Sequence, residues 1–192
     1  MTSSNYFDPV SDLAVAQFSK PDDLAQIDFR KLSPFQRSLL ANDGTVTKLI
    51  EAYTMEPVEI VRIAQGLKSV SAFYDWLEIT KGSTAMFREV LLRGKHSQVI
   101  YAYAISLIIR DRLQAMVKEN LEVDGLGLGQ ILLSSKMETY REVLWYGREQ
   151  AKSLPELIHH LEGTEFISRM YRIIAGGQPI MLINEKFPFI PQ

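Results

Sequence analysis

The sequence contains no cysteine among its 192 residues, which excludes disulfide bonds, thiolate nucleophiles and cysteine-ligated metal sites. Histidine is scarce too. Of the three present, His159 and His160 are adjacent and therefore point to different sides of a helix, and His96 stands alone. No pair has the spacing of a zinc-binding helix motif, so we expect no metal ion.

The sequence also has no large excess of positive or negative charge, since the formal net charge is −2. Such a chain has no general attraction to nucleic acid or to an anionic membrane. The longest apolar stretch, VIYAYAISLII, ends before Arg110 and is too short to span a bilayer. The N-terminus has no basic start followed by an apolar run. We therefore expect a cytoplasmic protein that binds neither nucleic acid nor membrane.

The composition that remains is typical of a globular domain, with 46% hydrophobic and 23% charged residues. A chain of this length can bury a sizeable core in one domain. We expect a single domain over residues 1–192, in which residues 1–30 match no recognisable element.

Helices are predicted first. The stretch Ser33-Pro34-Phe35-Gln36 has a capping residue, a proline at the first helical position and a glutamine at the third, and it predicts a helix to about Ala41. Asn42-Asp43-Gly44 breaks it. A second helix, TVTKLIEAYT, follows directly, with Asp43 or Thr45 as its cap.

After Pro57 the pattern becomes that of strands, rich in Val, Ile, Tyr and Phe with partial alternation. Two of the strands flank Gly176-Gly177, which predicts a hairpin. Residues 110–121 and 129–137 look helical, and Ser153 to Glu156 have the spacing of a capping box before another short helix. We predict an α+β fold with about six mainly antiparallel strands and helices packed against the sheet. A doubly wound sheet fits less well, because helices do not follow every strand. The predicted strands are VEIVRIAQ, FREVLL, VIYAYAISLI, VLWYGREQ, ISRMYRIIA and PIMLINEKF.

Three charged residues share a strand face with apolar neighbours. Arg88 is in phase with Val90 and Leu92, Arg172 with Met170 and Ile174, and Glu185 with Ile183 and Phe187. Each alone is compatible with an edge or a surface position. Three on neighbouring strands indicate an internal polar site, where charges must be paired with each other or with a ligand.

Two glycine-containing turns, DGTVT at 43–47 and GLGLG at 125–129, each lead into a helix. Free N–H groups make helix starts natural anion acceptors, and a guanidinium adds two parallel bonds to a carboxylate. Either turn alone is compatible with an ordinary connection. GLGLG is not a dinucleotide fingerprint, because Gln130 replaces the last glycine, and Ser134-Ser135 lacks the nucleophile elbow of a hydrolase.

Four segments together resemble the chorismate lyase (chorismate–pyruvate lyase) family: SLLANDGTVTKLIEAY, FREVLLRG, GLGQILLSS and RMYRIIAGGQPIMLINEKFP. Their order and spacing hold from about residue 32 to residue 188. The sequence is most similar to the cyanobacterial and plastid branch. This resemblance implies that Arg88 holds the ring carboxylate of the substrate together with backbone N–H groups near Val46 and Leu128. Glu185 falls on the carboxylate that meets the hydroxyl at the opposite end of the ring.

The sequence departs from the family pattern at two positions. Tyr103 aligns with a further arginine of many members, and Asn184 precedes the glutamate where a threonine is common. Both bear on how the enolpyruvyl carboxylate is held, and we expect Arg172 to compensate.

The resemblance implies a lyase that eliminates pyruvate from chorismate to give 4-hydroxybenzoate for quinone biosynthesis, including plastoquinone. No metal, organic cofactor or covalent intermediate is implied. We expect a monomer whose partner is this small substrate. The alternative is a non-catalytic sensor of aromatic carboxylates, because effector domains of some transcription regulators share the fold. Roughly 30 N-terminal residues are too few for a winged helix, which counts against a regulator but not against a stand-alone sensor.

Overall fold

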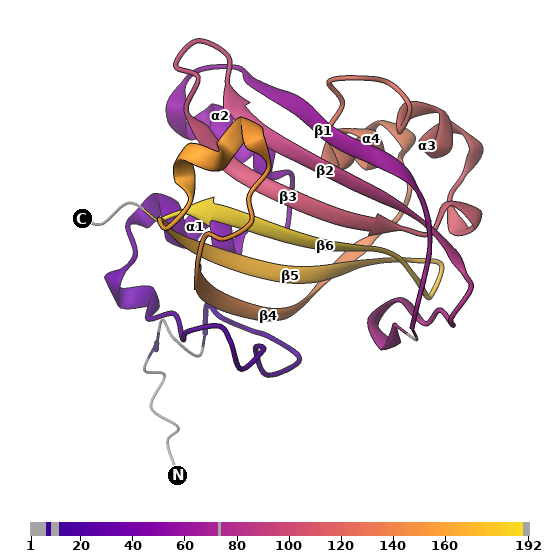
Figure 1. Cartoon of the computed structure of the whole chain (residues 1–192), viewed down its shortest axis with the longest axis horizontal. Helices are drawn as coiled ribbons and strands as arrows, with labels where there is room; N and C mark the ends of the chain where they lie inside the picture. Colours follow the sequence, from indigo (N-terminus) through magenta and orange to yellow (C-terminus); the bar gives the residue numbers. More distant parts are fainter. Residues whose placement is uncertain (1–6, 9–11, 73, 190–192) are drawn as a thin grey trace.

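The centre of the protein is one antiparallel sheet, in a computed structural model that describes residues 7–8, 12–72 and 74–189 (Figure 1). Its strands are β1 (Val58–Ser69), β2 (Thr84–Gly94), β3 (Ile100–Ile108), β4 (Tyr140–Gln150), β5 (Glu165–Ala175) and β6 (Gln178–Pro188). They lie in the order β1-β2-β3-β6-β5-β4, and each neighbouring pair is antiparallel. The predicted single-domain α+β fold with six strands is confirmed, as is the β5–β6 hairpin.

The helices precede the sheet or connect its two halves. They are α1 (Pro34–Ala41), α2 (Val46–Thr54), α3 (Ala115–Asn120) and α4 (Leu128–Ser135). The predicted capping box of α1 is confirmed, because the Ser33 hydroxyl accepts a hydrogen bond from the Gln36 N–H and the Gln36 side chain accepts one from the Ser33 N–H. Thr45 occupies the N-cap position of α2, but its side chain makes no capping bond. None of the helices in the described residues has the length and apolar composition needed to cross a bilayer.

Short 3-10 segments complete the chain: Phe29–Lys31, Asp75–Leu77, Arg110–Arg112 and Glu156–Leu161. The capping box expected from Ser153 to Glu156 is wrong. The last segment begins after Pro155 with no side-chain cap, because Ser153 adopts a left-handed backbone with φ 53° and cannot serve as a cap.

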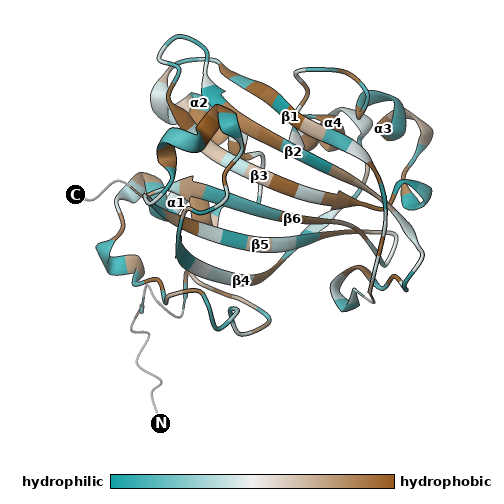
Figure 2. Ribbon diagram, viewed as in Figure 1, coloured by the Kyte–Doolittle hydropathy of each residue, from teal (hydrophilic) through white to brown (hydrophobic). Residues whose placement is uncertain are grey.

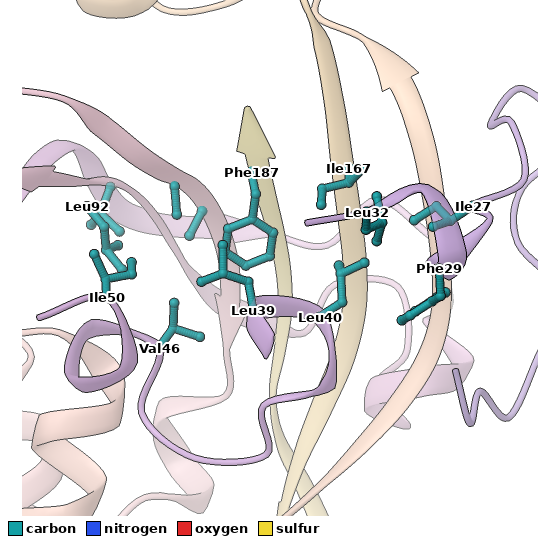
Figure 3. Close-up of a cluster of buried hydrophobic side chains, with 13 residues drawn as sticks. Ile27, Phe29, Leu32, Leu39, Leu40, Val46, Ile50, Leu92, Ile167 and Phe187 are labelled. Atoms are coloured by element: carbon teal, nitrogen blue, oxygen red, sulfur yellow. The ribbon is translucent and has the colours of Figure 1, made fainter. Parts of the chain in front are cut away.

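Both faces of the sheet are covered by other parts of the chain. On one face, side chains of α1 and α2, among them Leu39 and Ile50, point toward Phe187 of β6 and Leu92 of β2 (Figure 3). On the other face, Ile158 of the last 3-10 segment packs against Leu91 and Tyr103. Hydrophobic residues therefore occur on both sides of the strands, and the alternation along them is incomplete (Figure 2).

The N-terminal segment covers the edge strand β4. The Gln17 and Phe18 N–H groups donate to the Val143 and Leu144 carbonyls, and Ala25 pairs with Arg148. Residues for which the sequence predicts no element thus protect an edge that would otherwise be open to other strands.

Candidate active site

One pocket opens on the face of the sheet that α1 and α2 cover. The space between its atoms, counted together with open solvent at its mouth, is about 560 Å³. Strands β2, β3, β6, β5 and β4 contribute side chains to it, and the starts of α2 and α4 close it from the other side. The lining residues are Gly44, Thr45, Val46, Thr47, Arg88, Val90, Leu92, Ala104, Ser106, Gly127, Leu128, Gly129, Arg141, Tyr171, Ile173, Ile183 and Glu185.

Arg88 is a buried cation without a carboxylate partner. Its side chain belongs to a residue that is 1% exposed. Its Nη1 donates to Gln65 Oε1 (2.7 Å) and to the Leu121 carbonyl (3.0 Å), and its Nη2 donates to the Leu126 carbonyl (2.6 Å). Burial lowers the pKa of Arg88 and the charge of Arg62 lowers it further, whereas the carboxylates of Asp124 and Glu122 oppose the shift. Among the described residues, no ion pair neutralises this guanidinium.

Two N–H groups of Arg88 have no acceptor among the described residues. A guanidinium has five N–H donors, and three of these are used by the protein. The Nε–H group is buried without an acceptor, and one N–H remains on Nη2. Because Nε and Nη2 share an edge that matches the two oxygens of a carboxylate, Arg88 is arranged to bind an anion supplied from outside.

The two predicted glycine turns meet beside this arginine. Thr45 is the N-cap of α2 and Gly127 is the N-cap of α4, and neither helix start has a side-chain hydrogen bond to its N–H groups. A Cβ atom added to Gly129 would lie 3.0 Å from Cγ2 of Thr45, so the absence of a side chain allows the two starts to approach each other. Two positive helix ends therefore face the same space as Arg88.

Glu185 lies at another part of the pocket and is paired within the protein. It is 8% exposed, and its Oε2 accepts a hydrogen bond from Nε of Arg169 (2.9 Å). Arg169 Nη2 lies 2.8 Å from the same oxygen, in an orientation that makes an ion-pair contact rather than a hydrogen bond. Tyr171 donates its hydroxyl proton to Oε1 (3.0 Å). Glu185 is thus held as an acceptor by two neighbours on β5.

The neighbours of Glu185 have pKa values shifted by their surroundings. Burial raises the pKa of Tyr171, the charge of Glu185 raises it further, and Arg169 and Arg141 oppose the shift, so the phenol stays protonated at neutral pH. Burial lowers the pKa of Arg169, but the charge and hydrogen bond of Glu185 together with Tyr171 and Tyr146 outweigh it, so the net shift is upward. The Arg169 Nη1 also donates to the Leu40 and Asn42 carbonyls, which ties the turn before α2 to the floor of the pocket.

The register of the sheet sets the distance between Arg88 and Glu185 in the pocket. Arg88 pairs with Ser106, and Ser106 pairs with Ile183, two residues before Glu185. Arg88 and Glu185 therefore lie two strands apart and one same-face step along, which corresponds to about 10 Å across the strands and about 7 Å along them. The small side chains of Ala104 and Ser106 lie between them and leave room for a ring.

Two residues expected to bind substrate, Arg172 and Tyr103, do not line this pocket. Arg172 donates to Glu142 Oε2 (2.5 Å) and to the Trp76 carbonyl (3.3 Å), and Tyr103 donates to Glu89. Both side chains lie on the opposite face of the sheet, since Tyr103 packs with Leu91 there. The expectation that Arg172 compensates for Tyr103 is therefore wrong, because the Arg172 side chain does not reach the pocket.

A β-bulge explains the position of Arg172. Ala175 pairs with Gln178 and Ile174 with Pro179, but Ile173 pairs with Met181, so one residue of β6 is skipped. Without this shift, Arg172 would oppose Met181 and share the face of Glu185. With it, Arg169 opposes Glu185, because a one-residue slip moves every side chain of a strand to the other face.

The sequence reasoning missed four polar residues of the site: Ser106, Arg141, Arg169 and Tyr171. Arg169 is in phase with Ile167 and Ile173, and this signal is as strong as the one that favoured Arg172. Because both faces of β5 are buried, alternation alone could not choose between the two arginines.

Comparisons with known proteins agree with this fold and add a family. In solved structures, PhnF from Mycobacterium smegmatis is similar to 77% of this chain with a TM-score of 0.60 and 10% identity, and the match spans 64% of that chain. The effector domain of the same protein is similar to 76% of this chain and is itself covered to 88%, with a TM-score of 0.58 and 10% identity. At such low identity these likenesses show the fold alone.

Proteins found by sequence comparison are more similar to this chain than these solved structures are. The chain is 31% identical to a chorismate pyruvate-lyase of Mycobacterium leprae over 85% of this chain and 79% of the relative. It is 30% identical to a chorismate pyruvate-lyase of Mycobacterium tuberculosis over 85% of this chain and 84% of the relative. A cyanobacterial or plastid branch stays a prediction. Since the model of the Rv2949c-like chorismate pyruvate-lyases matches residues 40–191, the chain belongs to this family.

Proposed function

We propose that this protein eliminates pyruvate from chorismate and leaves 4-hydroxybenzoate. Family membership supports the reaction class, because the relatives carry the name chorismate pyruvate-lyase. We further propose that the product is 4-hydroxybenzoate and that it is used in quinone biosynthesis, such as that of plastoquinone.

The observation that carries the proposal is the unpaired charge of Arg88. A buried cation with no ion-pair contact is costly, and a bound carboxylate lowers that cost. The ring carboxylate of chorismate would accept the Nε and Nη2 protons of Arg88. Backbone N–H groups at Val46 and Leu128, the first residues of α2 and α4, would share it.

Glu185 is proposed to accept the proton of the ring hydroxyl in a hydrogen bond. A carboxylate offers about four lone-pair positions, and Arg169 and Tyr171 occupy part of them. Oε1 accepts one hydrogen bond, from Tyr171, and so keeps room for a second donor. Because Arg169 and Tyr171 both donate hydrogen bonds to Glu185, we assign this carboxylate the role of acceptor or base rather than acid.

The reaction needs little else from the protein. The ether bond between ring carbon 3 and the enolpyruvyl oxygen breaks, and carbon 4 loses a proton as the ring becomes aromatic. The leaving group takes up a proton at its methylene carbon and departs as pyruvate. The residues orient the dianion and stabilise charge in a pocket whose walls, including Val90, Ile173 and Ile183, are apolar.

A sensor is the second candidate, because the fold is shared with the effector domain of PhnF. The same Arg88 and Glu185 would then hold an aromatic carboxylate without turnover.

The test is to incubate the purified protein with chorismate. Pyruvate is followed by a coupled assay, and the aromatic product by chromatography. Pyruvate and 4-hydroxybenzoate in equal amounts, well above the spontaneous background, support the lyase. An Arg88→Gln variant serves as the inactive control and an Arg172→Gln variant, altered on the opposite face, as the active one. Absence of turnover together with tight binding of 4-hydroxybenzoate would leave the sensor as the function.

A further inference from the structure

We propose that Arg141 binds the second carboxylate of chorismate, the one on the enolpyruvyl group, and so lets the site distinguish substrate from product. This inference rests on the proposed function and adds a residue that the sequence did not indicate.

Arg141 is a pocket residue with unused hydrogen-bonding capacity. It lies near the start of β4 and lines the pocket. Its Nη1 donates to the Asp43 carbonyl (2.5 Å), at the turn before α2. Its Nε is buried and has no acceptor. Buried N–H groups are almost always satisfied, and this one, at the wall of the pocket, is free to donate to a bound ligand.

Charge balance in the pocket supports a dianion. Three charged residues line it: Arg88, Arg141 and Glu185. Glu185 is neutralised by Arg169, whereas neither Arg88 nor Arg141 has an ion-pair partner among the described residues. Two cations without internal partners match the two carboxylates of chorismate. The product 4-hydroxybenzoate carries only one.

The position of Arg141 also fits the shape of the substrate. Glu185 on β6 pairs with Arg169 on β5, and Arg141 lies on β4, the strand beyond β5. Arg141 pairs with Ile173, two residues from Tyr171, whose hydroxyl contacts Glu185. The enolpyruvyl ether is attached to the ring carbon beside the hydroxyl-bearing one. A ring held by Arg88 and Glu185 would therefore carry this group beside Glu185, and Arg141 lies on the β5 side of that residue.

The test compares substrate turnover with product binding in Arg141→Gln. We expect kcat/KM for chorismate to fall about 10- to 100-fold, since charge-assisted hydrogen bonds are lost. The Kd for 4-hydroxybenzoate, measured by calorimetry, should stay within about 2-fold, because this ligand lacks the second carboxylate. Arg141→Lys should recover part of the turnover by restoring the charge. Arg148→Gln, on the same strand outside the pocket, should match the wild type.

Two results would overturn the inference: an unchanged kcat/KM, or a loss of 4-hydroxybenzoate affinity by the same factor as kcat/KM. The second would mean that Arg141 only supports the turn at Asp43. If the wild type shows no turnover, the proposed function fails by itself. The inference is then decided by the Kd values of chorismate and 4-hydroxybenzoate, and it survives only if Arg141→Gln weakens chorismate selectively.

Discussion

Replacement of Glu185 by alanine should destabilise the protein strongly, besides any effect on activity. Arg169 is 1% exposed, and Glu185 is its ion-pair partner. Removing one member of a buried pair leaves the other charge uncompensated, which typically costs about 3–5 kcal/mol. Tyr171 loses its acceptor as well. Because small domains have an unfolding free energy of about 5–15 kcal/mol, Glu185→Ala is a poor probe of catalysis.

A double-mutant cycle measures how much the Glu185–Arg169 pair contributes to stability, separately from any effect on activity. We expect Glu185→Leu and Arg169→Met each to lower the free energy of unfolding by several kcal/mol. The combination Glu185→Leu with Arg169→Met should recover most of this loss, because neither charge then remains buried alone. Urea unfolding is followed by the fluorescence of Trp76 and Trp145, both on the opposite face from Glu185. With slopes of about 1–3 kcal/mol per M, a loss of this size moves the midpoint by more than about 1 M.

A loss below about 1 kcal/mol in Glu185→Ala would refute this reasoning, since it would mean that solvent reaches Arg169 in the folded protein. A double variant as unstable as the sum of the single ones would show that the two residues act independently.

Three further predictions concern Arg88, Arg172 and Glu56. Arg88→Gln should weaken 4-hydroxybenzoate binding about 100-fold or more in calorimetry, because two charge-assisted hydrogen bonds are lost; an unchanged Kd would remove Arg88 from the site. Arg172→Gln should leave kcat/KM within about 2-fold and cost less than about 1 kcal/mol of stability, since its pair with Glu142 is partly exposed and lies outside the pocket. Hydrogen bonds from the Ser97 side chain and backbone, with smaller ones from Tyr101 and His96, lower the pKa of Glu56 from 4.5 to about 2. A carboxyl group whose pKa is lowered on folding stabilises the protein at pH values above its unfolded pKa, and this stability is lost as the pH falls from 4.5 toward 2. Glu56→Gln should therefore flatten the dependence of the unfolding free energy on pH in that window. A parallel decline in the wild type and the variant would contradict this.

Several parts of this protein could be predicted from the sequence because they depend on local chemistry. The capping box at Ser33 acts within one helical turn, and the glycines at 176 and 177 have the left-handed backbone of the hairpin turn, with φ values of 56° and 77°. The two glycine-containing helix starts, together with Arg88 and Glu185, were predicted to share a site, and they do line one pocket. In each case a pattern over a few residues was sufficient.

The remaining features depend on the pairing of distant strands. The bulge in the β5–β6 hairpin decides that Arg169, and not Arg172, faces Glu185, and no local pattern marks it because both faces of β5 are apolar. The position of Arg141 depends on the path of β4 at the far edge of the sheet, beside a turn almost one hundred residues earlier in the chain. The sequence by itself therefore determined the elements and one pair of charges in the pocket. Only the tertiary structure decided which further charges join them, because strand register and burial on two faces are set by packing rather than by local propensity.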